Sequence, residues 1–284
     1  MTKIAWVTDS MAYFTKEEAE AIGVNVVPIQ ILLGDTAYQE NAITVERLFR
    51  ALDADKKLIA KTSQPIFGEF VGTYERLKEE GYDCAIAVHC TNGLSSTVQS
   101  SASAAEAASF PVHIIDSHTA FENQQEFIRY GMELEAQGKS VEEIVAALQA
   151  LTKKTHFYMI VGNMETMRRG GRVSSGDLFL ANLLSIKPII TTDEAGKVVP
   201  FKKARSLKKA YIEMVKQIDE SMRHHTFYKN RIYVATTMAP EMAAELRQQV
   251  AAKFPDLTIL EGTFGPAIGT HAGAETVGLF WMND

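Results

Sequence analysis

The sequence is poor in cysteine, lacks a long apolar run and carries no excess of positive charge, and each of these features excludes a class of protein. Cys84 and Cys90 are its two cysteines, too few for a disulfide framework in a chain of 284 residues. Its 29 Lys and Arg residues are outnumbered by 35 Asp and Glu residues, which gives a formal net charge of −6. Because binding many phosphates needs a clustered basic face, we expect no nucleic-acid partner.

No part of the sequence has the ~18–20 consecutive apolar residues that a membrane-spanning helix needs. The longest apolar stretches, 24–33 and 178–190, are interrupted by Pro28 and by Lys187-Pro188. The N-terminus reaches Asp9 after a short apolar run, which does not resemble the h-region of a secretory signal. The hydrophobic fraction of 46% is enough for a packed core. We therefore expect a cytoplasmic protein without an integral membrane segment.

The first half of the chain alternates short β-branched segments with longer segments of helical periodicity. Strands are predicted at 3–8, 24–33, 84–88 and 112–115, and helices at 16–22, 45–52, 66–78, 95–108, 120–136 and 140–151. Thr44 and Ser140 are placed to cap two of these helices, since hydroxyls accept the N–H groups of a first turn. Strands that alternate with helices indicate crossover connections and a mostly parallel sheet.

The pattern changes near residue 155. Strands are predicted at 157–161, 187–192, 198–202, 232–236, 258–261 and 277–281, and helices at 207–222 and 240–253. The strands 187–192 and 198–202 are joined by a short turn, which predicts a hairpin and hence a mixed sheet. At about 150 residues per domain, the length also suggests two domains. We expect α/β domains at 1–155 and 156–284.

Four segments of small polar residues are candidates for a ligand site, because ligands of open parallel sheets bind beyond the carboxyl ends of the strands. They are Thr8-Asp9-Ser10, Thr62-Ser63-Gln64-Pro65, Thr91-Asn92-Gly93-Leu94-Ser95-Ser96-Thr97 and Asp116-Ser117. The third segment brings hydroxyls and backbone N–H groups to the start of a helix, where an anion is favoured. Two alternatives remain: Ser95 or Thr91 only caps that helix, and the segment from Thr62 is only the start of another one.

The second half has three candidate segments of its own. Arg168 to Ser174 places three arginines around Gly170-Gly171, which is suited to an anion or a partner but also to a solvated turn. The segment from Lys202 to Ser206 is a second basic cluster, for which a solvated strand end is the stronger alternative. His271 lies in a glycine-rich segment predicted to be a turn with little apolar cover, where it would donate to an anion or act as a base.

Several catalytic motifs are missing from the sequence. Ser95 lies in Gly-Leu-Ser-Ser-Thr, so the nucleophile elbow of esterases is missing, as are the phosphate-binding loop of many nucleotide-binding enzymes and the dinucleotide fingerprint. His89 and Cys90 adjoin each other on a predicted strand, where neighbouring side chains face opposite ways, so they are not paired metal ligands. Anion-binding groups without an evident nucleophile and base favour a binding protein over an enzyme.

Nine motifs together resemble the DegV family, whose members bind fatty acids. They are Val7-Thr8-Asp9-Ser10, Val27-Pro28-Ile29, Thr62-Ser63-Gln64-Pro65, Leu94-Ser95-Ser96-Thr97-Val98-Gln99-Ser100, Ile115-Asp116-Ser117, Arg169-Gly170-Gly171-Arg172-Val173-Ser174, Ile186-Lys187-Pro188-Ile189, Lys203-Ala204-Arg205-Ser206 and Gly269-Thr270-His271-Ala272-Gly273. They follow the family's order along essentially the whole chain. Ser96 departs from the family's usual glycine, and Val98 from its usual aromatic residue, so the geometry around the ligand headgroup is expected to differ.

The resemblance implies two α/β domains that clamp one acyl chain in an interdomain tunnel, with no cofactor other than this bound fatty acid. It implies that Thr62, Ser95 and His271 bind the carboxylate. It further implies that Arg172 and Arg205 support phosphoryl transfer and docking of a partner, the ATP-binding subunit of fatty acid kinase, which converts the bound acid to an acyl phosphate. Two alternatives stay open: a hydrolase or phosphotransferase that uses Ser95 with His271, and a regulatory protein that senses acyl chains.

Overall fold

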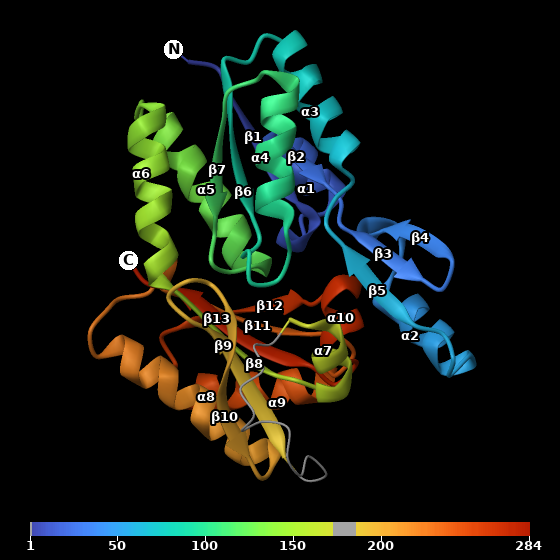
Figure 1. The fold of residues 1–284 in the computed structure, drawn as a ribbon. Coiled ribbons are helices and arrows are strands. Elements are labelled where there is room, and N and C mark those ends of the chain that lie inside the picture. The colour runs from blue at the N-terminus through green and yellow to red at the C-terminus, as the bar shows by residue number, and fades with distance from the viewer. Residues whose placement is uncertain (1, 173–185) are drawn as a thin grey trace. The chain divides into compact units, whose positions relative to one another are not determined.

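The computed structural model describes residues 2–172 and 186–284, which separate into two compact units (Figure 1). The first unit comprises Met1–Ile43 and Ile59–Lys153, and the second comprises Thr44–Leu58 and Lys154–Asp284. The expected division into domains 1–155 and 156–284 stays a prediction. The structure adds that the segment Thr44–Leu58, from the first half of the sequence, packs with the second unit.

A four-stranded parallel sheet forms the centre of the first unit. Its strands are β1 (Ile4–Asp9), β2 (Val24–Val27), β6 (Cys84–His89) and β7 (Val112–Asp116), in the order β2-β1-β6-β7. Figure 1 shows α3 (Phe67–Glu79) and α4 (Thr97–Ala108) on one face, and α5 (Phe121–Ala136) and α6 (Val141–Leu151) on the other. The helix α1 (Lys16–Ile22) connects β1 to β2. The predicted parallel sheet with flanking helices is confirmed.

Alternation along β1 explains how both faces of this sheet are covered. Ala5 and Val7 point into a core that they share with α3 and α4. Trp6 points to the opposite face, where its indole Nε1 donates to Glu135 of α5 over 2.7 Å. A Cβ atom at Gly131 would lie 2.2 Å from the Trp6 ring, so a glycine is required for α5 to approach the sheet so closely.

A second, three-stranded antiparallel sheet in the first unit is absent from the sequence prediction. It consists of β3 (Gln30–Leu33), β4 (Thr36–Gln39) and β5 (Ala60–Ser63), in the order β4-β3-β5. The single strand expected at 24–33 is wrong, because the chain leaves the parallel sheet at Pro28 and starts β3 in the new sheet. Proline lacks an N–H group to continue a ladder of hydrogen bonds.

The second unit is built on a six-stranded mixed sheet, as predicted. Its strands are β8 (Thr155–Ile160), β9 (Lys187–Thr192), β10 (Val198–Ala204), β11 (Arg231–Thr236), β12 (Thr258–Thr263) and β13 (Val277–Met282), in the order β10-β9-β8-β13-β11-β12. The predicted hairpin is confirmed by antiparallel pairing of β9 with β10. The pair β11 and β12 is parallel.

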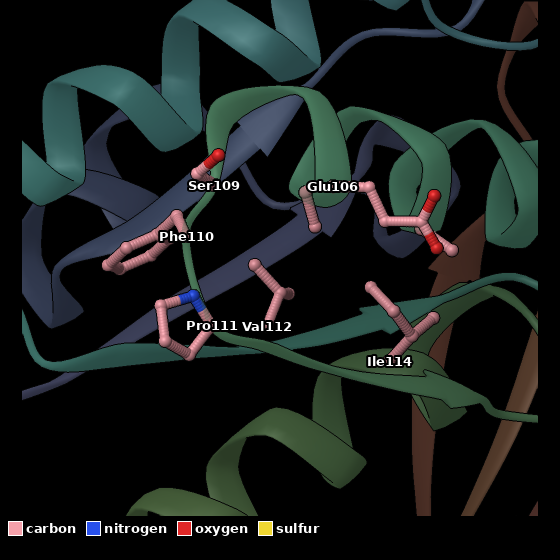
Figure 2. Close-up of a pocket in the computed structure, with 8 residues that line it drawn as sticks. Glu106, Ser109, Phe110, Pro111, Val112 and Ile114 are labelled. Carbon is pink, nitrogen blue, oxygen red and sulfur yellow. The ribbon is translucent and has the colours of Figure 1, made fainter.

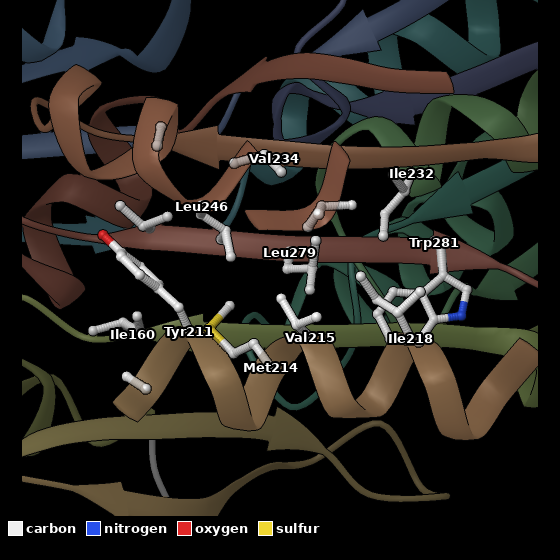
Figure 3. Close-up of a cluster of buried hydrophobic side chains, with 14 of the residues drawn as sticks. Ile160, Tyr211, Met214, Val215, Ile218, Ile232, Val234, Leu246, Leu279 and Trp281 are labelled. Atoms are coloured by element: carbon white, nitrogen blue, oxygen red, sulfur yellow. The ribbon is translucent and has the colours of Figure 1, made fainter. Parts of the chain in front are cut away.

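The core of the second unit lies between this sheet and two long helices, α8 (Leu207–Met222) and α9 (Pro240–Lys253). Figure 3 shows Tyr211, Met214 and Ile218 of α8 pointing at the strands, against Leu279 and Trp281 of β13. Both helices have the bounds that the sequence predicts. Among its described residues, the unit also contains the shorter helices α2 (Val45–Ala54), α7 (Met164–Gly170) and α10 (Pro266–Ala272).

Local sequence signals explain where several helices begin. Thr15 and Ser140 form capping boxes with the glutamates three residues later, at the starts of α1 and α6. Thr44 caps α2 by accepting the N–H group of Arg47, as expected. Short 3-10 helices at Ser10–Ala12, Glu40–Ala42, Thr152–Lys154 and Tyr228–Asn230 complete the described secondary structure. No helix among the described residues combines the length and the apolar character needed to cross a bilayer.

His156 of β8 is held in its neutral form by the packing of the second core. Its ring stacks on Trp281, and its Nε2 atom lies 2.7 Å from the Asn283 amide, whose oxygen accepts the hydroxyl of Ser221 over 2.9 Å. That orientation makes the Asn283 nitrogen a donor and His156 Nε2 an acceptor. Burial, and to a smaller extent nearby His225, lowers the pKa of His156 from 6.5 to about 4.

We expect the free energy of unfolding to fall as the pH is lowered from 6.5 to 4, because only the unfolded state protonates His156 in that range. His156→Gln removes the titrating group. The loss of unfolding free energy between pH 6.5 and 4 should therefore be smaller in this variant by up to about 3 kcal/mol. Urea titrations at a series of pH values measure it. The exposed His224 gives the control variant His224→Gln. Equal slopes for His156→Gln and the wild-type chain would show that His156 does not titrate as described.

Candidate functional site

Ser95 lies in the turn that connects β6 to α4. The Thr91 carbonyl and hydroxyl accept the backbone N–H groups of Leu94 and Gly93, which closes the turn. The helix begins at Thr97, two residues later than predicted, and its N-cap residue Ser96 makes no side-chain cap hydrogen bond. The capping alternative for Ser95 and Thr91 is therefore wrong. Ser95 instead presents a half-buried hydroxyl beside the positive end of a twelve-residue helix.

A buried partner orients the Ser95 hydroxyl. Ser95 Oγ lies 2.8 Å from Oγ1 of Thr97, a residue without solvent exposure. Thr97 in turn lies beside the Cys90 thiol. Burial, followed by the nearby Asp9 and Asp116 carboxylates, raises the pKa of that thiol well above its ordinary value, against a smaller opposite effect of Thr97. Cys90 is therefore a protonated structural group and not a nucleophile.

The same network continues through a serine, a histidine and an aspartate. The Asp9 carboxylate accepts the Cys90 N–H over 2.9 Å and lies 3.2 Å from His89 Nδ1. His89 Nε2 lies 2.7 Å from Ser101 Oγ, which is 2.5 Å from the Tyr74 hydroxyl. This order of groups matches a catalytic triad. Asp9, His89 and Ser101 all have 0% exposure, so no substrate reaches them, and the network holds the turn in place.

Sequence reasoning missed this network, although part of the signal was present. Thr97 and Ser101 are four residues apart and so share one face of α4. A polar pair on the buried face of a helix needs partners in the core. The partners, Asp9, His89 and Tyr74, come from three other elements, and no local pattern identifies them.

Thr62 lies within β5, where it pairs with Ile31 of β3. It is half-buried, and α3 begins only at Phe67, so the segment from Thr62 is a strand followed by a connection. The alternative that Thr62 is only the start of a helix is therefore wrong. Thr62 and Ser95 lie on separate elements of the same unit.

His271 lies in the last turn of α10, in the second unit. The glycine-rich turn expected at 265–273 is wrong, because Pro266 starts a helix after the N-cap residue Gly265. Most of that helix is buried, so His271 has the apolar cover that the sequence did not predict. Burial, followed by the charge of Arg172, lowers the pKa of His271 from 6.5 to about 4. The imidazole is therefore neutral at physiological pH and donates through one N–H group.

Two glycines allow the close packing around His271. A Cβ atom at Gly170, the last residue of α7, would lie 2.3 Å from His271 Nδ1. A Cβ atom at Gly269 would lie 3.1 Å from the ring of Phe49 in α2. Gly171, with φ of 66°, ends α7 in the left-handed conformation. These contacts join elements that are distant in sequence. The sequence alone therefore indicated only that the glycines allow another group to approach the backbone closely.

The arginines around these glycines have different environments. Arg168 and Arg169 belong to α7, and both form ion pairs with Glu165. Arg172 turns back and donates to the Gly170 carbonyl, near His271. Val173 and Ser174, the end of this motif, lie outside the described residues. Arg205 is exposed between β10 and α8, whose N-cap residue is Ser206.

The structure thus brings some predicted site residues together within each unit. In the second unit, Arg172 and His271 share one environment with Gly170. In the first unit, Ser95 is supported by Thr97. The described part of the chain holds no group of three or more His, Cys, Asp or Glu side chains arranged for a metal ion.

The described residues form two α/β units, one built on a parallel sheet and one on a mixed sheet. The family model described as "Uncharacterised protein, DegV family" matches residues 3–284, and the chain belongs to this family. It is similar to a DegV domain-containing protein of Halalkalibacterium halodurans, with 33% identity over 284 residues and 99% of each chain covered. It is also 32% identical over 286 residues to protein DegV of Bacillus subtilis, with 98% of each covered.

Solved structures agree over the whole chain. A DegV family protein from Thermus thermophilus, described by its fatty acid binding, matches with 29% identity and a TM-score of 0.89. DegV from Bacillus subtilis, described as a fatty acid binding protein, matches with 30% identity and a TM-score of 0.87. Each match covers 100% of both chains. The family resemblance and the α/β fold class are confirmed.

Replacing Gly170 by alanine tests whether this glycine positions His271. The added methyl group would meet His271 Nδ1, so Gly170→Ala should displace the ring and raise its pKa from about 4 towards 6.5. Overpacking should also cost about 1–3 kcal/mol of stability. An NMR titration of the His271 imidazole measures the first effect.

The matched control for this prediction is Gly72→Ala. A Cβ atom at Gly72, in the middle of α3, meets nothing within 4 Å. Gly72→Ala should therefore leave the His271 titration unchanged. An unaltered His271 pKa in Gly170→Ala would contradict the positioning role.

Proposed function

We propose that this protein binds a long-chain fatty acid and that Thr62, Ser95 and His271 donate hydrogen bonds to its carboxylate. The observation that carries the proposal is full-length agreement with DegV family structures described as fatty acid binding proteins, at 26–30% identity. The family resemblance supports Thr62, Ser95 and His271 as the residues that bind the carboxylate. The bound fatty acid is the ligand, and no other cofactor is proposed.

The chemistry of the proposed donors suits a carboxylate. An ionised carboxylate only accepts hydrogen bonds, and burying it without donors costs several kcal/mol. Two hydroxyls and a neutral imidazole N–H supply three donors without a formal ion pair. Burying ~16 methylenes at ~0.8 kcal/mol each contributes roughly 13 kcal/mol before the costs of ordering. The acyl chain thus provides the affinity, and the donors fix the headgroup.

We further propose that the protein is the lipid-binding, non-catalytic partner of a kinase that phosphorylates the bound acid. The family resemblance supports Arg172 and Arg205 as the residues that serve this step. Arg205 is exposed, which suits contact with a separate ATP-binding subunit. Two hydroxyls and a neutral imidazole would bind the carboxylate without an ion pair, which would leave it more nucleophilic than a direct contact with a lysine or arginine would.

The enzyme alternative requires His271 to activate Ser95 as a general base. The pKa of His271, lowered to about 4 by burial and then by Arg172, makes it a weak base at neutral pH. The buried Asp9, His89 and Ser101 arrangement has no access for a substrate. These observations favour a binding protein. Incubating the purified chain alone with acyl esters, or with ATP and a fatty acid, tests the alternative directly, and steady turnover would establish it.

The carboxylate site is tested by the double variant Thr62→Ala with Ser95→Ala. Losing donors to a charged group costs about 1.5–3 kcal/mol, so fatty acid affinity should fall roughly tenfold or more. Native mass spectrometry measures the lipid that co-purifies, and titration of delipidated protein gives the affinity. The control is Ser63→Ala with Ser96→Ala, which removes the neighbouring hydroxyls. Equal lipid content in both double variants would show that Thr62 and Ser95 do not bind the carboxylate.

The kinase proposal is tested by Arg172→Ala and Arg205→Ala. Each variant should retain bound fatty acid but be phosphorylated more slowly by an added ATP-binding subunit. The exposed Arg223, which pairs with Asp219 at the end of α8, supplies the control Arg223→Ala. If the variants lose lipid while docking to the kinase persists, the two arginines belong to the ligand site.

A further inference from the structure

The strand β7 is an edge of the parallel sheet in the first unit, with β6 as its one neighbour. The register pairs Ala85 with Val112 and His89 with Asp116. Two flanking hydrogen bonds fix which backbone groups face β6: Ala85 N–H donates to the Pro111 carbonyl, and Ser117 N–H donates to the His89 carbonyl. The backbone groups of His113 and Ile115 therefore point to β6, and those of Val112 and Ile114 point away from the sheet.

These outward groups form an open row. Within the described residues, no hydrogen bond reaches the backbone N–H or C=O of Val112 or Ile114. Free N–H and C=O groups on a sheet edge are the template on which a further strand is added. The edge thus has the hydrogen-bonding capacity for an extended chain.

A groove of about 390 Å³ lies beside this row, between β7 and α4 (Figure 2). Val112 and Ile114 line it from the strand, and Ala102, Ala105 and Ser109 line it from the helix. The small side chains of α4 leave room over the sheet edge, where the side chains of an added strand would lie. A small apolar residue, such as valine, fits such a surface at every second position of an added strand.

The charged groups around the β7 edge determine which kind of partner segment fits it. Glu106 is exposed in the wall of the groove, and Figure 2 shows its carboxylate near Ile114. On the other face of β7, His113 is close enough to Glu142 of α6 to contribute to its lowered pKa, after larger effects of the Glu142 N–H and the Ser140 hydroxyl. Lys78 of α3 lies at the end of the groove formed by Ser109, where its ammonium donates to the carbonyls of Ala108 and Ser109. Both faces of the open edge thus carry a carboxylate.

We propose that the β7 edge and its groove dock an extended segment of a partner protein, in which basic residues alternate with small apolar ones. The segment adds as a strand to Val112 and Ile114. Its apolar side chains enter the groove on the α4 face, and its basic side chains, which the alternation directs to the opposite face, reach Glu142. A second copy of this chain fits less well. A two-fold pairing of β7 strands about Ile114 would place two Glu106 carboxylates face to face.

The test uses the full chain with its co-purified lipid and two labelled ten-residue peptides, one of alternating Lys and Val and one of alternating Glu and Val. Fluorescence anisotropy should detect binding of the Lys peptide and none of the Glu peptide. Glu142→Lys, at an exposed position of α6, should weaken binding of the Lys peptide about tenfold. The control Glu79→Lys makes the same charge change at an exposed position of α3 outside the groove and should leave binding unchanged.

A backbone variant tests strand addition separately from charge. Ile114→Pro removes an outward N–H group, which an edge strand tolerates, and should also weaken the Lys peptide about tenfold or more. Ile114→Val keeps the N–H group and should bind as the wild-type chain does. Circular dichroism checks that each variant is folded. The proposal is overturned if the Lys peptide does not bind, if both peptides bind alike, or if Glu142→Lys or a folded Ile114→Pro leaves binding unchanged. It is also overturned, in favour of a second copy, if sedimentation shows a dimer that Ile114→Pro dissociates.

Discussion

The buried carboxylate of Asp9 is the constraint around which the first unit is arranged. A carboxylate without solvent exposure must be surrounded by donors, since an unpaired buried charge costs several kcal/mol. Asp9 obtains them from the Met11 and Cys90 N–H groups and from the His89 ring. These donors come from the ends of β1 and β6, so satisfying one charge fixes the carboxyl ends of two neighbouring strands. The turn that carries Ser95 starts at that point.

In the second unit, the partly buried His271 stays neutral and so avoids the cost of a buried charge. His271 lies on a short helix packed against α7, and the approach is possible because Gly170 has no side chain. Burial disfavours the charged imidazole, and the positive charge of nearby Arg172 adds a smaller repulsion. The imidazole therefore stays uncharged. Packing, not an ion pair, sets the protonation state of the group proposed to bind the ligand.

Much of the fold was predictable because it follows from local patterns. The bounds of α1, α8 and α9, the capping boxes and the hairpin of β9 with β10 all come from signals within about twenty residues. The small antiparallel sheet was not predictable, since β3 and β5 are separated by an intervening helix and pair only in the tertiary structure. The helix α10 was missed for another reason: its glycines favour a turn locally, and packing against Phe49 overrides that preference.

The candidate site, like the fold, was only partly predictable from local sequence. Ser95 and His271 were identifiable by residue type and motif, but what governs them was not. The hydroxyl of Ser95 depends on Thr97, and the neutrality of His271 depends on burial and on Arg172. A free lysine in the place of these two residues would hold a carboxylate more strongly but would also neutralise it. Under the proposed function, neutral, pre-oriented donors would hold the headgroup without neutralising it themselves, which is the property a carrier needs if a separate enzyme is to act on its ligand.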